Sequence, residues 1–254
     1  MWDVALYETF GRERVRPSAD LAERLAGQTF GRIFDAGCGS GMSTAVLARM
    51  WPDARITGAD LSPEMLAAAR AALPRVRFVG RDCGQPFADL GPFDLVFSNA
   101  LLQWLPDPAA FIDNAFAALS AGGVLAAQIP LFDEMPAAAC LAAAAERAGL
   151  NGKSRFSLLS YGRYYDILTR YARSVDMWVT EYYHVMKNAA DICRFLSGTA
   201  LRPYFDDLSA GEREAFMESL TGNLAAAYSA QADGKTLFPF RRLFFVAEKD
   251  GSIR

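Results

Sequence analysis

Three glycines at alternate positions constrain the fold of this chain more than any other feature of its sequence. Gly37, Gly39 and Gly41 directly follow the short β-rich run at 32–34. Without Cβ atoms, the backbone can turn sharply from a strand into a helix, and a ligand can lie against the main chain. The loop therefore predicts a nucleotide-type site at the turn between a strand and a helix.

The segment 31–130 repeats one order of elements: a short β-rich run, a turn and an alanine-rich helical pattern. This alternation is typical of a parallel sheet with crossover helices. Ser62-Pro63 and Asp107-Pro108 each provide a capping side chain followed by proline, so each pair predicts a helix start. Gly122-Gly123 predicts the end of the second of these helices. Strands are predicted at 32–34, 55–59, 76–79, 93–98 and 124–128.

Beyond Pro130 the alternation breaks. Helices are predicted at 137–148, 189–196 and 211–228, and strands at 175–185 and 243–247. We expect these helices to pack over one end of the sheet as additions to a single domain, 1–254, rather than to form a second independent domain.

Composition excludes several classes of protein. The 254 residues, 52% of them hydrophobic, can bury a substantial core. A net charge of -3 without a local run of lysines or arginines argues against nucleic acid as a partner. No segment approaches the ~20 apolar residues that span a bilayer, so no membrane association is expected. The four cysteines are scattered and His184 is the only histidine, which favours neither a disulfide framework nor a metal site. We expect a cytoplasmic protein of undetermined oligomeric state.

The residue two positions before the loop separates two classes of ligand. Dinucleotide loops follow the pattern GxGxxG, whereas this chain has GxGxG preceded by Asp35. A pyrophosphate needs positive potential, which an acid at the loop entrance would oppose. Asp35 therefore favours a cationic ligand.

Further polar side chains follow the next predicted strands. Asp60, Asp82 and Asn99 each stand at a predicted strand end, and ligands of open parallel sheets bind at that edge. Asp60 is placed to accept from ribose hydroxyls and Asp82 from an adenine amino group. Three acids and an amide around an adenosine with a positive tail and no phosphates describe S-adenosylmethionine. Any one of these acids could instead be a helix cap or a solvated turn residue.

Neighbours of these residues complete the predicted cofactor site. It comprises Asp35, Gly37, Cys38, Gly39, Gly41, Asp60, Leu61, Asp82, Cys83 and Asn99. The two cysteines are expected to fill space rather than act as nucleophiles, because no base is close in sequence.

Patterns along nearly the whole chain carry a family resemblance. They are Trp2-Asp3, Tyr7, Phe10, Glu13-Arg14 and Arg16-Pro17, then QWLPD at 103–107, YYDIL at 164–168, VDxW at 175–178, YYH at 182–184, LRP at 201–203 and RLF at 242–244. With these patterns the chain resembles the class I methyltransferase family, and within it the trans-aconitate 2-methyltransferases. Glycine loops are shared by all class I methyltransferases, so the flanking patterns are the more specific part of the resemblance.

The resemblance implies a fold and an activity. The fold is a Rossmann-like α/β sheet of seven strands, mostly parallel with the last antiparallel. The implied activity is transfer of a methyl group from S-adenosylmethionine to a small carboxylic acid. It further implies an N-terminal helical lid at 1–26, a cofactor-binding core at 31–130 and a helical substrate cap at 131–160 and 188–230. The chain departs from the family at Leu131-Phe132 and Ala137-Ala138, where apolar or small residues replace polar ones beside the expected acceptor site.

A carboxylate acceptor is already ionised at pH 7, so no general base is required and the enzyme must chiefly align the reactants. An anionic acceptor needs arginines, whose planar fork matches a carboxylate. Arg202 is the first candidate, and Arg14 and Arg242 follow. His184 could orient the acceptor or be a structural residue within a strand.

Aromatic and amide side chains complete the predicted acceptor site. Gln103 and Trp104 would line its floor, and Tyr183 is a further candidate. Trp2 and Tyr7 recur with Phe10 at helical spacing, which indicates either an amphipathic helix packed on the core or a lid. In the second case Tyr7 would donate a hydrogen bond to the acceptor.

Three other functions stay open at this point. The same cofactor could serve an acyl-thioester acid, or a hydroxyl or carbon centre of a secondary metabolite. A binding protein could hold S-adenosylmethionine without turnover. An NAD-dependent oxidoreductase is disfavoured by the GxGxG spacing and by Asp35.

Overall fold

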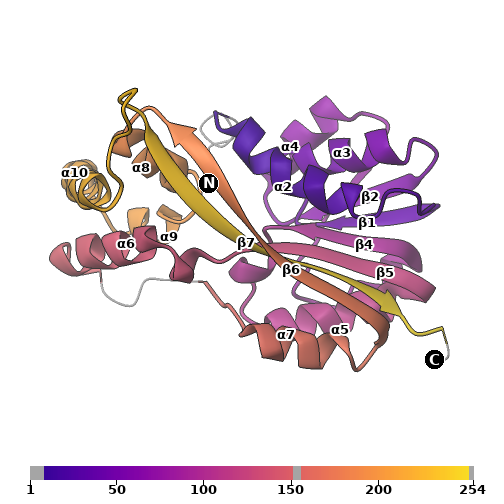
Figure 1. Cartoon of the computed structure of the whole chain (residues 1–254). Helices are drawn as coiled ribbons and strands as arrows, with labels where there is room; N and C mark the ends of the chain where they lie inside the picture. Colours follow the sequence, from indigo (N-terminus) through magenta and orange to yellow (C-terminus); the bar gives the residue numbers. More distant parts are fainter. Residues whose placement is uncertain (1–8, 151–155, 252–254) are drawn as a thin grey trace.

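The computed structural model describes residues 9–150 and 156–251, which fold around one mixed sheet (Figure 1). Its strand order is β3-β2-β1-β4-β5-β7-β6. The strands are β1 (Arg32–Ala36), β2 (Arg55–Asp60), β3 (Arg77–Gly80), β4 (Phe93–Asn99), β5 (Leu119–Pro130), β6 (Ala172–Met186) and β7 (Thr236–Lys249). β7 runs antiparallel to both β5 and β6, and the other strands run parallel to one another. The predicted seven-stranded sheet with an antiparallel last strand is confirmed.

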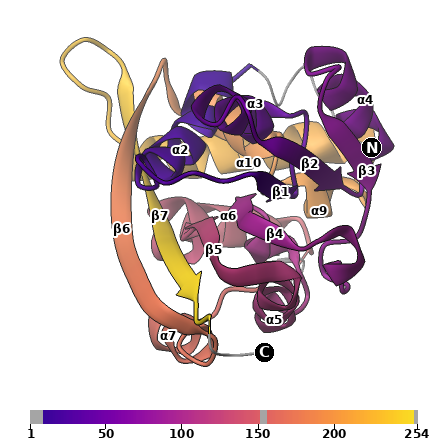
Figure 2. The ribbon, with the colours of Figure 1, turned by 90° about the vertical axis from the view of Figure 1, so that its right-hand side faces the viewer.

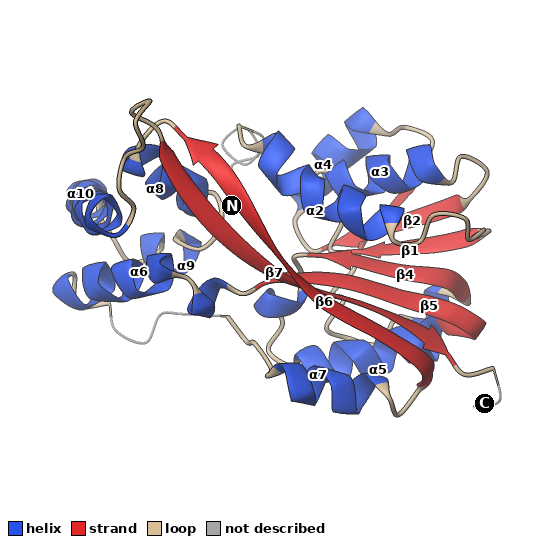
Figure 3. Ribbon diagram, in the orientation of Figure 1, coloured by secondary structure: helices blue, strands red, loops and turns tan. Residues whose placement is uncertain are grey.

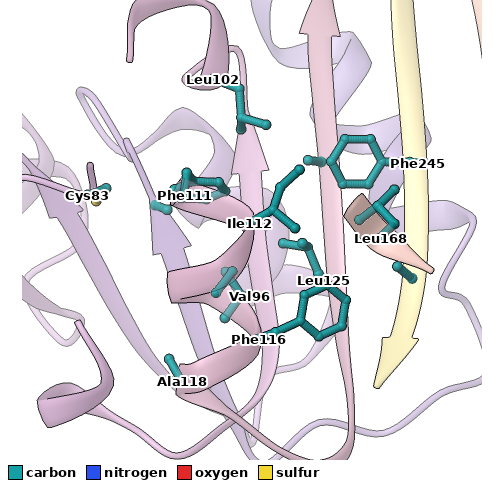
Figure 4. Close-up of a cluster of buried hydrophobic side chains, with 14 of the residues drawn as sticks. Cys83, Val96, Leu102, Phe111, Ile112, Phe116, Ala118, Leu125, Leu168 and Phe245 are labelled. Atoms are coloured by element: carbon teal, nitrogen blue, oxygen red, sulfur yellow. The ribbon is translucent and has the colours of Figure 1, made fainter. Parts of the chain in front are cut away.

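Helices cover both faces of this sheet (Figure 3). α2 (Gly11–Glu23), α3 (Met42–Met50) and α4 (Pro63–Ala72) lie on one face, and α5 (Pro108–Ala118) and α7 (Tyr161–Leu168) on the other. Successive side chains of a strand point to opposite faces. Ile33 accordingly packs with the α2–α3 layer, while Phe34 belongs to the cluster around Phe111 and Phe116 of α5, which Figure 4 shows. Strands buried on both faces explain the continuous apolar runs of the sequence.

A third group of helices lies beyond the carboxyl ends of β4 and β5. It comprises η3 (Phe132–Glu134), α6 (Pro136–Arg147), α8 (Ala189–Ser197), α9 (Arg202–Phe205) and α10 (Ala210–Ala227). In Figure 2, which looks along the central strands, α6, α9 and α10 lie behind the sheet. The long antiparallel pair of β6 and β7, between which α8, α9 and α10 lie in the chain, joins the two parts. Phe238 and Phe240 pack among these helices, whereas Phe244 and Phe245 pack on the sheet.

Two predicted helix starts are confirmed by capping hydrogen bonds. The Ser62 side chain accepts from the Met65 amide, and the Asp107 side chain accepts from the amides of Ala109 and Ala110. These bonds satisfy amide groups that the first helical turn leaves without partners.

The predicted end of the second helix at Gly122-Gly123 is wrong. The helix ends at Ala118, and the glycines lie inside β5. There Leu119 pairs with Phe93 and the register then shifts. A Cβ on Gly123 would lie 3.1 Å from the Phe93 carbonyl oxygen, so the glycine permits a close approach of two strands rather than a helix stop.

Candidate active site

The glycine loop connects β1 to α3 and has the conformation that only glycine adopts readily. Gly37, Gly39 and Gly41 have φ values of 71°, 54° and 90°. The amides of Gly37 and Cys38 both donate to the Ala59 carbonyl at 2.8 and 2.9 Å, which ties the loop to the end of β2. A Cβ on Gly37 would lie 2.9 Å from Leu101, so the position excludes larger residues by space as well as by φ.

A cavity opens directly beside this loop. Its described lining includes the predicted residues Arg14, Gly37, Gly39, Asp60, Leu61, Asp82, Cys83, Asn99, Gln103, Trp104 and Arg242. These residues come from the ends of β2, β3 and β4, from the glycine loop, from η2 (Leu102–Trp104), from α2 and, for Arg242, from the middle of β7. The fold thus brings most of the predicted site residues to one place.

The acidic side of the cavity lies at the ends of β2 and β3. Asp60 accepts from the Gly39 amide at 3.0 Å and from the Ser62 amide at 2.8 Å, and Asp82 accepts from the Gly84 amide at 2.8 Å. Asn99, at the end of β4, has a buried Oδ1 without a hydrogen-bond partner in the described part of the chain. Leu61 is 68% exposed in this lining. These groups suit a nucleoside, because its hydroxyl and amino groups can donate to the carboxylates and to the Asn99 oxygen, and its base can pack on the exposed Leu61 side chain.

Asp35 was predicted to face the ligand, but its side chain lies outside the cavity. Its carboxylate is fully buried beneath the loop and accepts from the Ser43 and Thr44 hydroxyls at 2.8 and 2.6 Å. Burial raises the pKa of Asp35 to about 6. The aspartate fixes the first turn of α3, and its charge does not face the cavity.

Cys38 and Gly41 also lie outside the described lining of the cavity. The Cys38 thiol is buried behind the loop, 3.1 Å from where a Cβ on Gly58 would lie. Burial raises the pKa of the Cys38 thiol far above its ordinary value, so the group stays neutral. Gly41 is the N-cap residue of α3. All three residues shape the loop from behind.

The basic side of the cavity is formed by two buried arginines. Arg242 on β7 is 5% exposed, donates to the Gln128 Oε1 at 3.0 Å and lies 4.5 Å from the Phe240 ring centroid. Arg14 on α2 donates to the Phe195 carbonyl at 3.0 Å. The strand order places β1, β4 and β5 between β2 and β7. The cavity is therefore acidic toward one side of the sheet and basic toward the other.

His184 lies behind the wall of the cavity. Its ring centroid is 5.6 Å from those of both Phe195 and Phe240, which line the cavity. Its Nε2 is buried without a hydrogen-bond partner among the described residues. Burial, with the nearby charge of Arg242, lowers the pKa of His184 to about 3, so the imidazole is neutral at pH 7.

Two predicted acceptor residues are not brought to the cavity. Tyr183 is 56% exposed and donates to Glu181, because strand alternation turns it away from the face that His184 occupies. Arg202 lies on α9 and is absent from the described lining. Trp2 and Tyr7 lie outside the described residues.

Sequence reasoning missed most of the apolar lining. The missed apolar residues are Met65, Ala100, Leu101, Leu105, Pro130, Phe156, Phe195, Leu196, Ala200 and Phe240, and the missed polar residues are Arg81 and Thr199. Phe132, two residues after the end of β5, also lines the cavity, where the family resemblance predicted it beside the acceptor. Phe195 and Phe240 carry no signal in the sequence, because packing of the third helical group places them.

No described helix is long and apolar enough to cross a membrane. Within 9–150 and 156–251, no group of histidine, cysteine and carboxylate side chains could hold a metal ion.

Comparisons with known proteins agree with this geometry. Residues 34–127 match the family described as a methyltransferase domain. The chain is 41% identical over 249 residues to a trans-aconitate 2-methyltransferase of Enterobacter sp. (strain 638), covering 98% of each chain. A protein of the same name from Azoarcus sp. (strain BH72) is 39% identical, covering 97% of this chain and 98% of the relative.

Two solved structures share the fold at low sequence identity. The YcgJ protein of Bacillus subtilis superposes with a TM-score of 0.61 at 13% identity, covering 92% of this chain and 99% of that one. A crystal structure described as a putative methyltransferase, from Bacillus halodurans, gives a TM-score of 0.60 at 17% identity with the same coverage. Both similarities extend over the sheet and its covering helices rather than over the glycine loop alone.

Proposed function

The chain belongs to the trans-aconitate 2-methyltransferase family of S-adenosylmethionine-dependent methyltransferases, and from this premise we propose that it esterifies a carboxylate of a small organic acid. The relatives are named for trans-aconitate, which is therefore the reference acceptor. When bound, S-adenosylmethionine supplies a methyl group on a positively charged sulfur, and the products are a methyl ester and S-adenosylhomocysteine.

The described residues fit this methyl donor. Gly37 and Gly39 line the cavity, the space beside Gly39 is open where a side chain would begin, and the buried Asn99 Oδ1 lacks a partner among the described residues. We assign Asp60 to the ribose hydroxyls and Asp82 to the adenine amino group. Each carboxylate already accepts backbone amides that fix its orientation, so it is positioned before the ligand binds.

The observation that carries the proposal is the pair of buried arginines opposite the acids. Arg14 and Arg242 both line the cavity and are less than a tenth exposed. A cationic pair in a water-poor site favours an anionic acceptor, and a guanidinium can hold a carboxylate through two hydrogen bonds. Of the predicted arginines, these two take the acceptor role rather than Arg202.

The residues around the acceptor perform positioning rather than proton transfer. A carboxylate is the nucleophile in its ordinary ionised form, and the buried His184 is neutral and separated from the cavity by rings. Correct alignment of two bound reactants can supply ~7–11 kcal/mol of the lowering of the barrier. His184 thus supports the wall rather than acting as a base.

The surrounding segments would exclude water from this reaction. We assign the lid to 1–26 and the substrate cap to 131–160 and 188–230, on the observation that Arg14, Phe132 and Phe195 from these segments line the cavity. We place the enzyme in the cytoplasm because Cys38, Cys83, Cys140 and Cys193 are free thiols, which suits a reducing compartment.

The test is turnover of labelled S-adenosylmethionine with mono-, di- and tricarboxylic acids, trans-aconitate included. We expect S-adenosylhomocysteine together with a labelled product that hydrolyses in base, as an ester does. A base-stable product would indicate an ether or a C-methyl group and overturn the carboxylate acceptor. Cofactor binding without turnover on any acid would indicate a binding protein instead.

A further inference from the structure

Gln128 lies behind the lining of the cavity, next to two residues that do line it. It stands on β5, between β4 and β7, and its register partners are Asn99 on β4 and Phe244 on β7. Asn99 and Arg242 belong to the described lining, whereas Gln128 does not and is fully buried. Gln128 can therefore affect a ligand only through the residues of the lining.

The Gln128 side chain holds the guanidinium of Arg242. Its Oε1 accepts from the Arg242 Nη1 at 3.0 Å. A guanidinium only donates hydrogen bonds, so the Gln128 atom that faces it is the oxygen, and the orientation of the amide is fixed. The guanidinium carbon of Arg242 also lies 4.5 Å from the Phe240 ring centroid and 6.0 Å from that of Tyr182. The rings and the hydrogen bond together restrict where the planar fork of Arg242 points.

The other end of the Gln128 amide indicates a role beyond packing. Its Nε2 is buried and has no hydrogen-bond partner among the described residues. A buried donor without a partner lowers stability, and an apolar side chain of the same length would fill this position without that cost. Within the described part of the chain, the only hydrogen bond of this side chain goes to Arg242. The polar group is therefore explained by what it does to Arg242.

The neutrality of Gln128 matters as much as its shape. A glutamate has the same length and would accept more strongly from Arg242. Its negative charge would also repel an anionic acceptor, and such repulsion is strong in a buried site. An uncharged carbonyl oxygen orients the guanidinium and adds no negative charge beside it.

We propose that Gln128 is a positioning residue for the acceptor: its carbonyl oxygen directs the Arg242 guanidinium toward the acceptor carboxylate without placing a negative charge beside it. This inference rests on the proposed carboxyl methylation and adds a residue that acts on the acceptor only through Arg242. The loss on substitution should be confined to the acid, because the methyl donor is assigned to the acidic side of the cavity.

Two substitutions at Gln128 separate orientation from charge. Gln128→Met removes the carbonyl oxygen but keeps an unbranched side chain that adapts to a core, and Gln128→Glu keeps an oxygen but adds a charge. With trans-aconitate as the acid, we expect KM to rise roughly tenfold in Gln128→Met and by a further factor of about ten in Gln128→Glu. The kcat, and the Kd of S-adenosylhomocysteine by calorimetry, should stay near the wild-type values. Where the wild type prefers another acid of the panel, that acid is the probe.

Gln28→Glu is the matched control for the added charge. Gln28 is exposed and lies on the loop before β1, whereas the cavity lies at the carboxyl ends of the strands. This variant should keep the wild-type KM and Kd.

A double-mutant cycle tests whether Gln128 acts through Arg242. In an Arg242→Gln protein, Gln128→Met should raise KM by less than about twofold, because no guanidinium is left to direct. A residue that only supports the sheet would give the same increase in both backgrounds.

The outcomes separate this inference from the function on which it rests. Unchanged KM in both folded Gln128 variants would overturn the inference and leave carboxyl methylation intact. Additive effects in the cycle, or a rise in the Kd of S-adenosylhomocysteine equal to the rise in KM, would overturn it by indicating a structural role. A smaller rise of KM in Gln128→Glu than in Gln128→Met would overturn it through the argument from charge. Failure of the wild type to yield S-adenosylhomocysteine with every acid would overturn the proposed function itself.

Discussion

At the scale of single residues, Asp60 makes the most direct prediction. Asp60→Asn should raise the Kd of S-adenosylhomocysteine roughly 10- to 100-fold, since a hydrogen bond to a charged group contributes about 1.5–3 kcal/mol. Asp53→Asn, an exposed acid on the loop before β2, is the matched control. Isothermal titration calorimetry measures both. An unchanged Kd in a folded Asp60→Asn protein would contradict the assignment of the ribose to Asp60.

The arginine pair makes a second residue-scale prediction. Arg242→Gln removes a guanidinium that is fixed by Gln128 and Phe240. We expect a loss of about 1.5–3 kcal/mol in kcat/KM for the acid, carried mainly by KM, with the affinity for the methyl donor unchanged. Arg173→Gln, an exposed arginine of β6 paired with Glu248, is the control. Equal losses in both variants would contradict an acceptor role for Arg242.

His184 should contribute to the dependence of the free energy of unfolding on pH. Its pKa is lowered to about 3 in the folded protein, so below the ordinary value of 6.5 the unfolded chain binds more protons than the folded one. The free energy of unfolding should therefore fall as the pH falls from about 6.5 to 4, by up to about 1.4 kcal/mol for each pH unit from this group. Urea unfolding at several pH values should show a shallower dependence for His184→Phe.

Asp35 should affect the pH dependence of stability in the direction opposite to His184. Its pKa is raised to about 6, so its contribution to stability falls as the pH rises from 3.8 to 6. Asp35→Asn should thus change the pH dependence in the sense opposite to His184→Phe. Changes of the same sign in the two variants would contradict these assignments.

The predictable residues were those whose position follows from strand ends. Asp60, Asp82 and Asn99 reach the cavity because the carboxyl ends of parallel strands share one edge. Asp35 stands one residue before the end of its strand and therefore points into the core, where hydroxyls of α3 bind it. Arg202 and Phe195 depend on how the third helical group packs, which local sequence does not determine.

At the scale of elements, glycine substitutions can distinguish the cost of a positive φ from the cost of a steric clash. Gly37 and Gly122 have nearly equal φ values of 71° and 72°, but a Cβ would contact Leu101 at 2.9 Å only at Gly37. Gly122→Ala should lower the free energy of unfolding by about 1–2 kcal/mol through φ alone. Gly37→Ala should cost more and abolish donor binding, and adding Leu101→Ala should recover part of the stability. Equal losses at the two glycines would show that the Leu101 contact is unimportant.

Element boundaries were predictable where a capping side chain or a proline marks them, as at Ser62 and Asp107. They were not predictable for β5 and β7, which extend well beyond their predicted limits, whereas β6 lies close to its predicted bounds. β7 continues into contacts with η3, and β6 into contacts with α8. Such contacts come from distant segments, so no local pattern contains them.

At the scale of the whole molecule, the antiparallel pair of β6 and β7 should make the sheet and the third helical group unfold together. Phe238 is fully buried among the helices, and six residues later Phe244 is fully buried on the sheet in the same strand. Phe238→Ala should lower the free energy of unfolding by about 3–5 kcal/mol. Because the strand is shared, the loss should appear in one transition, with coincident midpoints by far-ultraviolet circular dichroism and by tryptophan fluorescence. The chain has four tryptophans, of which Trp2 lies outside the described residues. Trp51, Trp104 and Trp178 lie within or beside the sheet. In a Trp2→Phe background the fluorescence therefore reports on the sheet rather than on α6 and α10. Two separated transitions, with only the circular dichroism signal destabilised by Phe238→Ala, would mean that the helical group unfolds independently. It would then be able to open over the cavity without loss of the sheet.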